Sequence, residues 1–482
     1  GILLGSLRTP PEFDNHIYLE DDGVTQRRFA SYDNPIWTQK FNKFNQKINR
    51  FLHSTEVKYM PMDWLTFNLR YGLDWYSYNY VERLAVGSAA SPSRMGGIYK
   101  TRIDNRQQNL DFTFNLNQSL MDGDLEFNLV GGSQSIWFDR STVGASATQT
   151  LAFFDEIAAG STKDASSSMT QTEIQGLFGQ LTTSYLDRYT ITLGVRRDGS
   201  STFGESQKFH TYPKASLSYV ISNEPFFEGM KDIFSNFRLR AAYGQAGSPD
   251  LPYAYATNNV YITDGNFDPW VESSESKRGG FNGIRSSAVA GAKDINPETS
   301  TETEFGFDIG LLNDAVSIEF SYFHSDVEDL IMSLPAPAST GFTNMLKNGG
   351  AMWNKGYEIG LTARLFSTDD FSWVTRLNYT TTSNEVTRLD ADFYTLTGGF
   401  VGLLNAAVKG MPLGTFQTVG WLRYDDAKAK DPANAGSKWE VTDAERAYYK
   451  QLTGRDYQNG DIRVSYWDPA NKEVVNDDYG MN

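Results

Sequence analysis

The chain has 482 residues, an aromatic content of 14%, no cysteine and a formal net charge of -16. The lack of cysteine excludes a disulfide framework and a thiolate metal site, and the acidic balance argues against a nucleic-acid surface, which needs a basic patch. No apolar run approaches the length of roughly 20 residues that a membrane helix requires, which argues against a helical membrane protein.

The strongest predicted element covers residues 64–75. Its odd-numbered positions from Leu65 to Trp75 are apolar or aromatic, while the positions between them are polar or glycine. Side chains alternate across a strand, so this pattern predicts a strand with one apolar and one wet face. The element is longer than the usual 5–6 residues of a globular strand and matches the roughly 9–11 residues that cross a bilayer at a tilt.

The same alternation recurs along the chain. It predicts further strands in these segments: 109–120, 125–129, 189–195, 237–243, 305–311, 316–322, 357–363 and 373–379. Alternating strands alone also fit a large soluble all-β protein, such as a propeller or a row of sandwiches. So many amphipathic strands need a water-filled space for their polar side chains, and the inside of a wide barrel provides one.

The predicted connections alternate between short and long. Short ones lie near 61–63, 121–124, 186–188, 312–315 and 367–370, and long ones near 81–104, 139–168, 247–300, 331–353 and 385–415. Outer-membrane barrels have short periplasmic turns and longer outside loops. The fold class that we predict is therefore all-β, a transmembrane antiparallel β-barrel in the outer membrane with its apolar face against lipid.

The chain begins at Gly1 without a methionine or a signal peptide, and it ends in a polar stretch without a closing strand. We interpret the chain as a portion of a longer protein, with a mature protein carrying an ordinary polar tail as the alternative. Residues 1–424 are predicted to supply barrel strands with long extracellular loops, and residues 425–482 an extracellular loop or tail that leads to missing last strands.

Several blocks of the sequence resemble the SusC/RagA family of TonB-dependent outer-membrane transporters of Bacteroidetes. They are collinear with that family and cover nearly the whole chain: 7–13, 187–204, 212–224, 239–247, 296–303, 341–358 and 412–416. The resemblance implies a 22-stranded barrel with a plug domain that is not in this chain. It also implies a SusD-like surface lipoprotein as a lid, and energy from TonB–ExbB–ExbD through segments that this chain lacks. The family's usual substrates are glycans (oligosaccharides) and sometimes peptides.

The sequence carries no pattern of catalytic residues. We find no nucleophile elbow, no His-Glu-x-x-His and no phosphate-binding glycine loop, and the four histidines are scattered (His16, His53, His210 and His324). The acidic spacing of a calcium loop is not kept in residues 460–471. We therefore expect no enzyme activity, no metal and no cofactor.

Two groups of residues are candidates for function. Loop 247–300 is rich in aromatic and polar residues that suit a glycan, although packing of the aromatic residues within the loop or against a lid protein is the more ordinary explanation: Tyr253, Tyr255, Tyr261, Phe267, Asp268 and Trp270. The alternation places a set of charged residues in the lumen, where they would face the plug: Arg70, Arg196, Arg238, Arg240, Glu304, Asp308, Arg364 and Arg376. A lumen charge costs little, whereas an arginine on the lipid face near the midplane costs about 2–4 kcal/mol.

Aromatic residues cluster at strand ends and are predicted to form an interfacial girdle: Trp75, Tyr76, Tyr78, Tyr80, Trp137 and Phe138. The predicted function is TonB-dependent import of a nutrient, an oligosaccharide or a peptide. The alternatives are a passive porin without a plug and a soluble or surface-bound β-rich binding or adhesion protein.

Overall fold

The computed structural model describes most of the chain. The described residues are 2–151, 154–248, 251, 253–264, 283–398, 404–417, 426, 430, 441–461, 466–468 and 473–475. Contacts divide the chain into two units. The wall unit comprises residues 1–348 and 357–381, and the second unit comprises residues 349–356 and 382–482.

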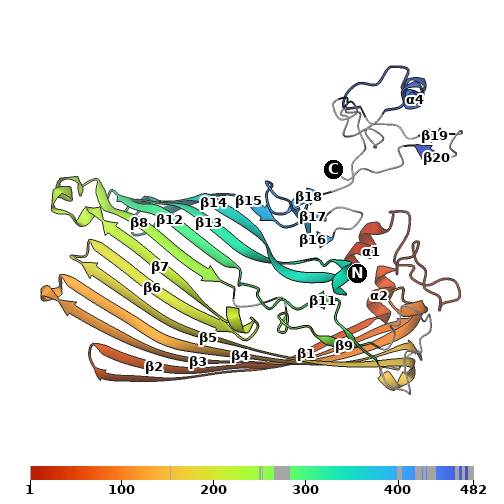
Figure 1. Cartoon of the computed structure of the whole chain (residues 1–482), viewed down its shortest axis with the longest axis horizontal. Helices are drawn as coiled ribbons and strands as arrows, with labels where there is room; N and C mark the ends of the chain where they lie inside the picture. The colour runs from red at the N-terminus through yellow and green to blue at the C-terminus, as the bar shows by residue number, and fades with distance from the viewer. Residues whose placement is uncertain are drawn as a thin grey trace. The chain divides into compact units, whose positions relative to one another are not determined.

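The dominant feature of the wall unit is one sheet of long antiparallel strands that follow one another in chain order (Figure 1). These strands are β1 (Lys43–Met62), β2 (Leu65–Val86), β3 (Met95–Leu120), β4 (Leu125–Thr150), β5 (Gly160–Tyr185), β6 (Tyr189–Ser200), β7 (Phe209–Val220), β8 (Phe234–Gly247), β12 (Thr299–Leu311), β13 (Val316–Pro335), β14 (Asn344–Ser367) and β15 (Ser372–Leu389). The short β11 (Val289–Ala290) joins β14 in parallel and completes a 13-stranded sheet. Each predicted strand segment is present.

Tight turns join these strands at one end of the sheet. Leu186 and Asp187 have φ values of 54° and 51° in the turn between β5 and β6. Two successive positive φ values are typical of the type I′ hairpin turn, whose twist matches that of the flanking strands. Met121 and Asp122, both at φ 55°, repeat this conformation between β3 and β4. The short connections near 121–124 and 186–188 are therefore confirmed.

Most of the predicted long connections are wrong in extent, because the strands continue through them. Strand β2 runs on to Val86 and β3 begins at Met95, so the connection predicted at 81–104 has only eight residues outside the strands, 87–94. The strands β3, β4 and β5 each contain 26 residues, far more than the roughly 9–11 that a bilayer crossing needs. In β2 the apolar alternation ends at Trp75, but the hydrogen-bonded ladder continues to Val86.

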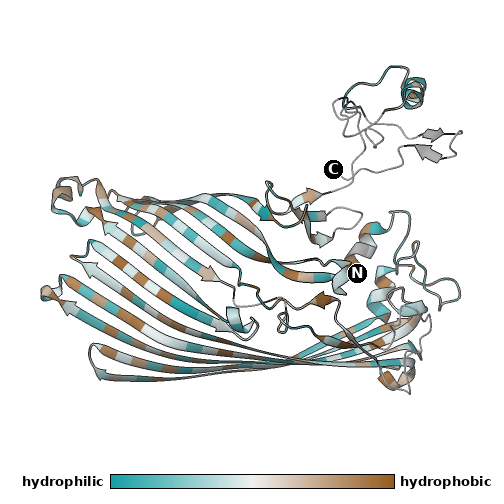
Figure 2. Ribbon diagram, in the orientation of Figure 1, coloured by the Kyte–Doolittle hydropathy of each residue, from teal (hydrophilic) through white to brown (hydrophobic). Residues whose placement is uncertain are grey.

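The register keeps the two faces of the sheet separate. Leu69 pairs with Phe112, and Leu193 pairs with Leu181 and Ala215, on what we call the apolar face. Figure 2 shows the resulting alternation of hydrophobic and hydrophilic residues along the strands. At the level of Trp75 this face becomes polar, because Arg106 of β3 lies opposite Trp75 and forms an ion pair with Asp139 of β4, 2.6 Å away.

Two shorter parts complete the wall unit. Helices α1 (Ile2–Arg8) and α2 (Pro35–Phe41) precede β1. Asn34 caps α2 by accepting hydrogen bonds from the backbone N–H groups of Ile36 and Trp37. The connection from β8 to β12 contains β9 (Tyr261–Asp264) and β10 (Gly283–Ser286), which form a hairpin.

Besides residues 349–356 of β14 and 382–389 of β15, the second unit contains short elements. Strands β16 (Tyr394–Gly398), β17 (Leu404–Ala407) and β18 (Thr415–Gln417) form an antiparallel sheet. They are followed by helix α4 (Asp443–Thr453) and by the hairpin of β19 (Tyr466–Asp468) and β20 (Glu473–Val475). None of the helices in the described ranges is both long and apolar enough to cross a bilayer.

Candidate functional site

The polar face of the sheet, opposite the apolar face, carries a row of paired side chains at one level. Arg70 on β2 lies opposite Asp111 on β3, which lies opposite Gln134 on β4. The row continues to Gly176 on β5 and Asp198 on β6. Alternation along each strand and register between strands thus bring side chains from five strands into one line.

Hydrogen bonds connect this row. Arg70 Nη2 lies 2.9 Å from Asp111 Oδ2, and Gln134 Nε2 donates to Asp111 Oδ1 over 2.8 Å. Arg196 Nη2 donates to Gln134 Oε1 over 2.9 Å, while its Nε donates to Asp198 Oδ1 over 2.7 Å. The charges of both arginines are therefore compensated within the wall.

The link from β6 to β4 requires a gap on β5, and Gly176 supplies it. A Cβ atom at Gly176 would overlap Arg196 Nη2 and Asp198 Oδ1. The guanidinium therefore lies over a position without a side chain and reaches the strand beyond. A glycine in a strand interior weakens the strand, and close approach by another group is a physical reason to find one there.

A second cluster joins β8, β12 and β13 on the same face. The carboxylate of Asp308 is 8% exposed and accepts from Arg238 Nε over 2.7 Å, with Arg240 Nε 3.2 Å away. Arg240 Nη1 also donates to Glu304 Oε1 over 3.2 Å. Ser321 donates to that same oxygen over 2.8 Å.

This cluster repeats the arrangement seen at Gly176. Arg240 lies opposite Gly306 of β12, which lies opposite Ser321 of β13. A Cβ atom at Gly306 would come within 3.0 Å of Arg240 Nη2. The guanidinium of Arg240 passes over the glycine and donates to Ser321 Oγ over 3.2 Å.

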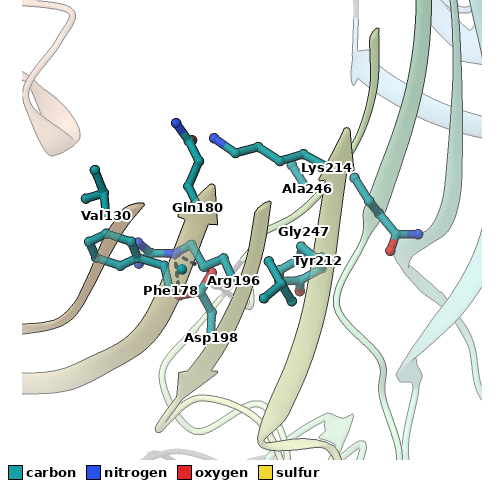
Figure 3. A pocket seen from close by; sticks show the side chains of 12 residues that line it. Val130, Phe178, Gln180, Arg196, Asp198, Tyr212, Lys214, Ala246 and Gly247 are labelled. Atoms are coloured by element: carbon teal, nitrogen blue, oxygen red, sulfur yellow. Dashed lines mark hydrogen bonds and ion pairs between the residues drawn. The ribbon is translucent and has the colours of Figure 1, made fainter. Parts of the chain in front are cut away.

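Between the two clusters the polar face is hollowed around Lys214 of β7. One recess of about 410 Å³ is lined by Gln180, Arg196, Tyr212 and Lys214, with Phe178 at its side (Figure 3). The dashed lines in Figure 3 mark the pair that Arg196 forms with Asp198 within this recess. The lining therefore offers amide, guanidinium, hydroxyl and ammonium donors from three neighbouring strands.

A second recess of about 480 Å³ lies on the other side of Lys214. Small residues of β8, Ala242, Gly244 and Ala246, leave this space open, and Glu302 and Glu304 line its far side. Glu304 is held by Arg240, whereas Glu302 is exposed and has no hydrogen bond or ion pair among the described residues. Lys214 thus has a region rich in donors on one side and carboxylates on the other.

The structure brings six of the eight predicted lumen residues into ion pairs on the polar face. These are Arg70, Arg196, Arg238, Arg240, Glu304 and Asp308. Arg364 and Arg376, on β14 and β15, are exposed and form no ion pair within the described ranges. That this face lines the lumen and meets a plug stays a prediction.

The loop candidates are placed only in part. Tyr253 and Tyr255 are 43% and 50% exposed. Next to them, Leu251 and Ala256 are buried in a small core with Phe203, Ile295 and Leu346. This core fixes the base of the loop and leaves the two tyrosines at its surface. Phe267, Asp268 and Trp270 lie outside the described residues, so their role stays a prediction.

The predicted aromatic girdle is wrong for the tyrosines of β2. Tyr76 lies opposite Arg50 and Asn105, on the same face as Asp74 and Arg70. Tyr78 and Tyr80 follow on that polar face, with their ring centroids 6.3 Å apart. Consecutive residues of a strand point to opposite faces, so a run of aromatics cannot form one girdle. Trp75 and Trp137 do lie on the apolar face.

The sequence reading missed the residues that organise the site. Asp111 and Lys214 carried the signal of alternation, since each lies between apolar residues of its strand, whereas Gln134 lies between two serines and carried no such signal. The glycines had no such signal, because their importance depends on which residues lie opposite them. Among the described residues no cluster of histidine and acidic residues is arranged to hold a metal ion, and most of residues 460–471 lie outside them.

Comparisons with known proteins identify the family. The family model described as "TonB dependent receptor-like, beta-barrel" matches residues 4–479. The TonB-dependent receptor P39 of Formosa agariphila is 25% identical over 468 residues, which cover 93% of this chain and 42% of that protein. The TonB-dependent receptor SusC of Bacteroides thetaiotaomicron is 28% identical over 240 residues, 48% of this chain and 23% of that protein.

The fold has a counterpart among solved structures. The structure of the RagAB peptide transporter matches with a TM-score of 0.70 at 18% identity, and the match covers 86% of this chain and 44% of that one. The chain spans less than half the length of each of these three proteins. The strand pattern, the two-faced sheet and the family match agree, so the chain belongs to the TonB-dependent receptor-like β-barrel family and its long sheet is part of the wall of an outer-membrane barrel.

Proposed function

We propose that this chain is part of the barrel of an active importer that carries a nutrient across the outer membrane and is energised through TonB. The observation that carries the proposal is the match of residues 4–479 to the TonB-dependent receptor barrel family. Energy coupling would use a plug and a TonB-contacting segment outside this chain. As a receptor barrel the chain is a transport protein rather than an enzyme, which agrees with the absence of catalytic motifs.

The polar face supports transport rather than simple anchoring in the membrane. Its ion pairs compensate most of the arginines within the wall, so they can line a water-filled space at little cost. We assign this face to the lumen, where Arg70, Arg196, Arg238 and Arg240 would border the plug. Arg364 and Arg376, which lack ion pairs in the described ranges, would be available to it.

The cargo that we propose is an oligosaccharide, with a peptide as the second candidate. The likeness to SusC favours the first, and the likeness to RagAB, which is described as a peptide transporter, favours the second. A SusD-like surface lipoprotein would cover the barrel. Tyr253, Tyr255, Phe267, Asp268 and Trp270 would contribute to the outer surface that cargo or lid meets.

The test is uptake by the full-length transporter in its native host. Cells would be grown on single oligosaccharides and peptides with the gene intact, deleted or restored, and in a strain depleted of TonB. We expect cargo-dependent growth that requires both the gene and TonB. Uptake that persists without TonB would instead support the passive porin, and a detergent-free soluble monomer would support the adhesion alternative.

A further inference from the structure

Three cations on the polar face share one local arrangement. Each lies over a glycine of the neighbouring strand: Arg196 over Gly176, Arg240 over Gly306 and Lys214 over Gly194. At Gly194 a Cβ atom would come within 2.7 Å of Lys214 Cε. In each case the missing side chain lets a long cationic side chain cross one strand and present its charge beyond it.

Two of the three cations have their partner on the strand beyond. Arg196 reaches Gln134 of β4, and Arg240 reaches Ser321 of β13. Lys214 crosses β6 toward Gln180 of β5, because Gly194 lies opposite both residues. Its ammonium group has no hydrogen bond or ion pair among the described residues. Lys214 is therefore placed like the two arginines, but its ammonium group borders the recess without a partner among the described residues.

The recess around that ammonium is suited to an anion. Gln180, Tyr212 and Lys214 border it together with Arg196, whose side chain is 37% exposed (Figure 3). The single carboxylate in the lining, Asp198, is paired with Arg196, whose Nε–H group lies 2.7 and 2.8 Å from its two oxygens in a bifurcated hydrogen bond. The lining consequently carries a net positive charge, and the ammonium group of Lys214 is available to an anion, which is the chemistry that recognises a carboxylate.

We propose that this recess of about 410 Å³ binds a carboxylate group, with Lys214 as the residue that supplies the charge. The carboxylate has two possible sources, an acidic side chain from a part of the same protein outside this chain and an acidic cargo such as a uronic acid. The inference rests on the proposed import function only for the second source. Carboxylate binding to the purified protein can be measured whether or not uptake is energised.

The experiment uses the full-length transporter and three variants. Lys214→Gln removes the charge and keeps a hydrogen-bonding side chain, and Lys214→Arg keeps the charge. Lys231→Gln is the matched control, since Lys231 lies outside the recess and, among the described residues, forms an ion pair only with the exposed Glu228, at 2.6 Å. Each protein must show the heat-modifiable gel mobility of a folded barrel before it is used.

The first arm measures binding of trigalacturonate and of its methyl ester to the purified transporter by calorimetry. If the carboxylate belongs to cargo, Lys214→Gln weakens trigalacturonate binding by about tenfold and leaves ester binding unchanged. The second arm measures cargo-free ion conductance in planar bilayers. If the carboxylate belongs to the rest of the protein, Lys214→Gln raises the conductance by about tenfold because the internal contact is loosened.

Weaker trigalacturonate binding or higher conductance in Lys214→Gln supports the proposal that the recess binds a carboxylate, provided that Lys214→Arg and Lys231→Gln behave like the parent protein. The proposal is overturned if Lys214→Gln changes neither acidic-probe binding nor conductance. It is equally overturned if Lys214→Arg produces the same change as Lys214→Gln, because charge would then not be responsible. Neither arm requires TonB, so a failure of energised uptake would leave both results interpretable.

Discussion

Gly176 lies directly beneath the guanidinium of Arg196, at a position where any side chain would overlap it. The two residues belong to neighbouring strands, β5 and β6, and the glycine opens the path by which Arg196 reaches Gln134 on β4. The relationship shows how the wall holds its charges. A cation is compensated across two strands because the strand between them carries no side chain at that point.

Replacing this glycine should detach Arg196 from Gln134. In Gly176→Ala the methyl group displaces the guanidinium, and the bond to Gln134 Oε1 is lost. We expect a destabilisation of about 1 kcal/mol, the usual net contribution of one hydrogen bond. The measurement is the urea midpoint for unfolding of the full-length barrel from lipid vesicles.

The same strand offers the control for this substitution. Gly179 has no atom within 4 Å of the place where a Cβ would stand. Gly179→Ala should therefore leave the urea midpoint unchanged or raise it slightly, since alanine restricts the unfolded chain. Equal effects at the two glycines would contradict the role assigned to Gly176.

Asp308 should be the most sensitive carboxylate on the polar face. It is buried and lies 2.5 Å from Arg238 Nη2 and 3.2 Å from Arg240 Nε. In Asp308→Asn two guanidinium groups face each other without the charge between them. We expect a loss of about 1–2 kcal/mol in the free energy of unfolding, because both arginines still reach water and lose only part of their stabilisation.

Glu319 provides the comparison for Asp308. It lies directly opposite Asp308, on β13, and forms no ion pair within the described ranges. Glu319→Gln removes the same formal charge, so it should change the stability by less than Asp308→Asn does. If both variants lose stability equally, general charge balance rather than the specific pairs would explain the effect.

The sequence was sufficient to predict on which face of a strand each side chain lies, but not which residue on the neighbouring strand it contacts. Alternation placed Arg70, Arg196 and Asp308 together on the polar face, because the period of a strand is a local property. It could not tell that Arg70 meets Asp111, since register depends on pairing between separate segments. The same limit hid the glycines, whose function is defined only by the residue that crosses them.

Strand length was underestimated for a related physical reason. The apolar period follows the apolar face, and it ends near Trp75, where this face becomes polar. The ladder of backbone hydrogen bonds continues to Val86, but residues 81–86 show no alternation of apolar and polar side chains. Residues 81–86 consequently read as a loop in the sequence, although they are strand in the structure.

The assignment of the apolar face to lipid can be tested by placing a charge on each side. Leu193 lies on the apolar face and Thr192 on the polar face of β6. Leu193→Arg should cost about 2–4 kcal/mol in folding into vesicles if it lies near the bilayer midplane. Thr192→Arg should cost much less, because its charge meets water. Equal losses in urea midpoint would refute the assignment.

The end of the described chain contains a pH-sensitive contact outside the sheet. Arg455 donates to Asp461 over 2.8 and 3.1 Å, and Gln458 N–H and Tyr449 Oη donate to the same carboxylate over 2.8 Å each. These hydrogen bonds, led by that of Arg455, hold the pKa of Asp461 well below its usual range. The contact therefore favours the folded segment above the ordinary pKa of about 3.9 and is lost as the pH falls through the lower, folded pKa.

A carbon NMR titration of the Asp461 carboxyl group checks this prediction. The midpoint should lie below that of an ordinary aspartate, and Arg455→Gln should move it upward. Arg455→Gln should remove only part of the lowering of the Asp461 pKa, because Gln458 and Tyr449 still donate to the carboxylate. An unchanged midpoint in Arg455→Gln would show that the guanidinium is not the main cause.

Hydrogen bonds to the Glu224 carboxylate connect the turn between β7 and β8 to the start of β6. Its carboxylate is 7% exposed and accepts from Arg188 Nη1 and from Tyr219 Oη over 3.2 Å each, and also from Tyr189 Oη. Glu224→Ala leaves these donors without their acceptor, so we expect a loss of about 1–3 kcal/mol in the free energy of unfolding. Glu224→Gln should lose less, because an amide oxygen still accepts. The control is Glu228→Ala, which removes an exposed ion pair with Lys231. An equal loss in the free energy of unfolding in Glu228→Ala would show that the hydrogen bonds of Glu224 have no specific stabilising role.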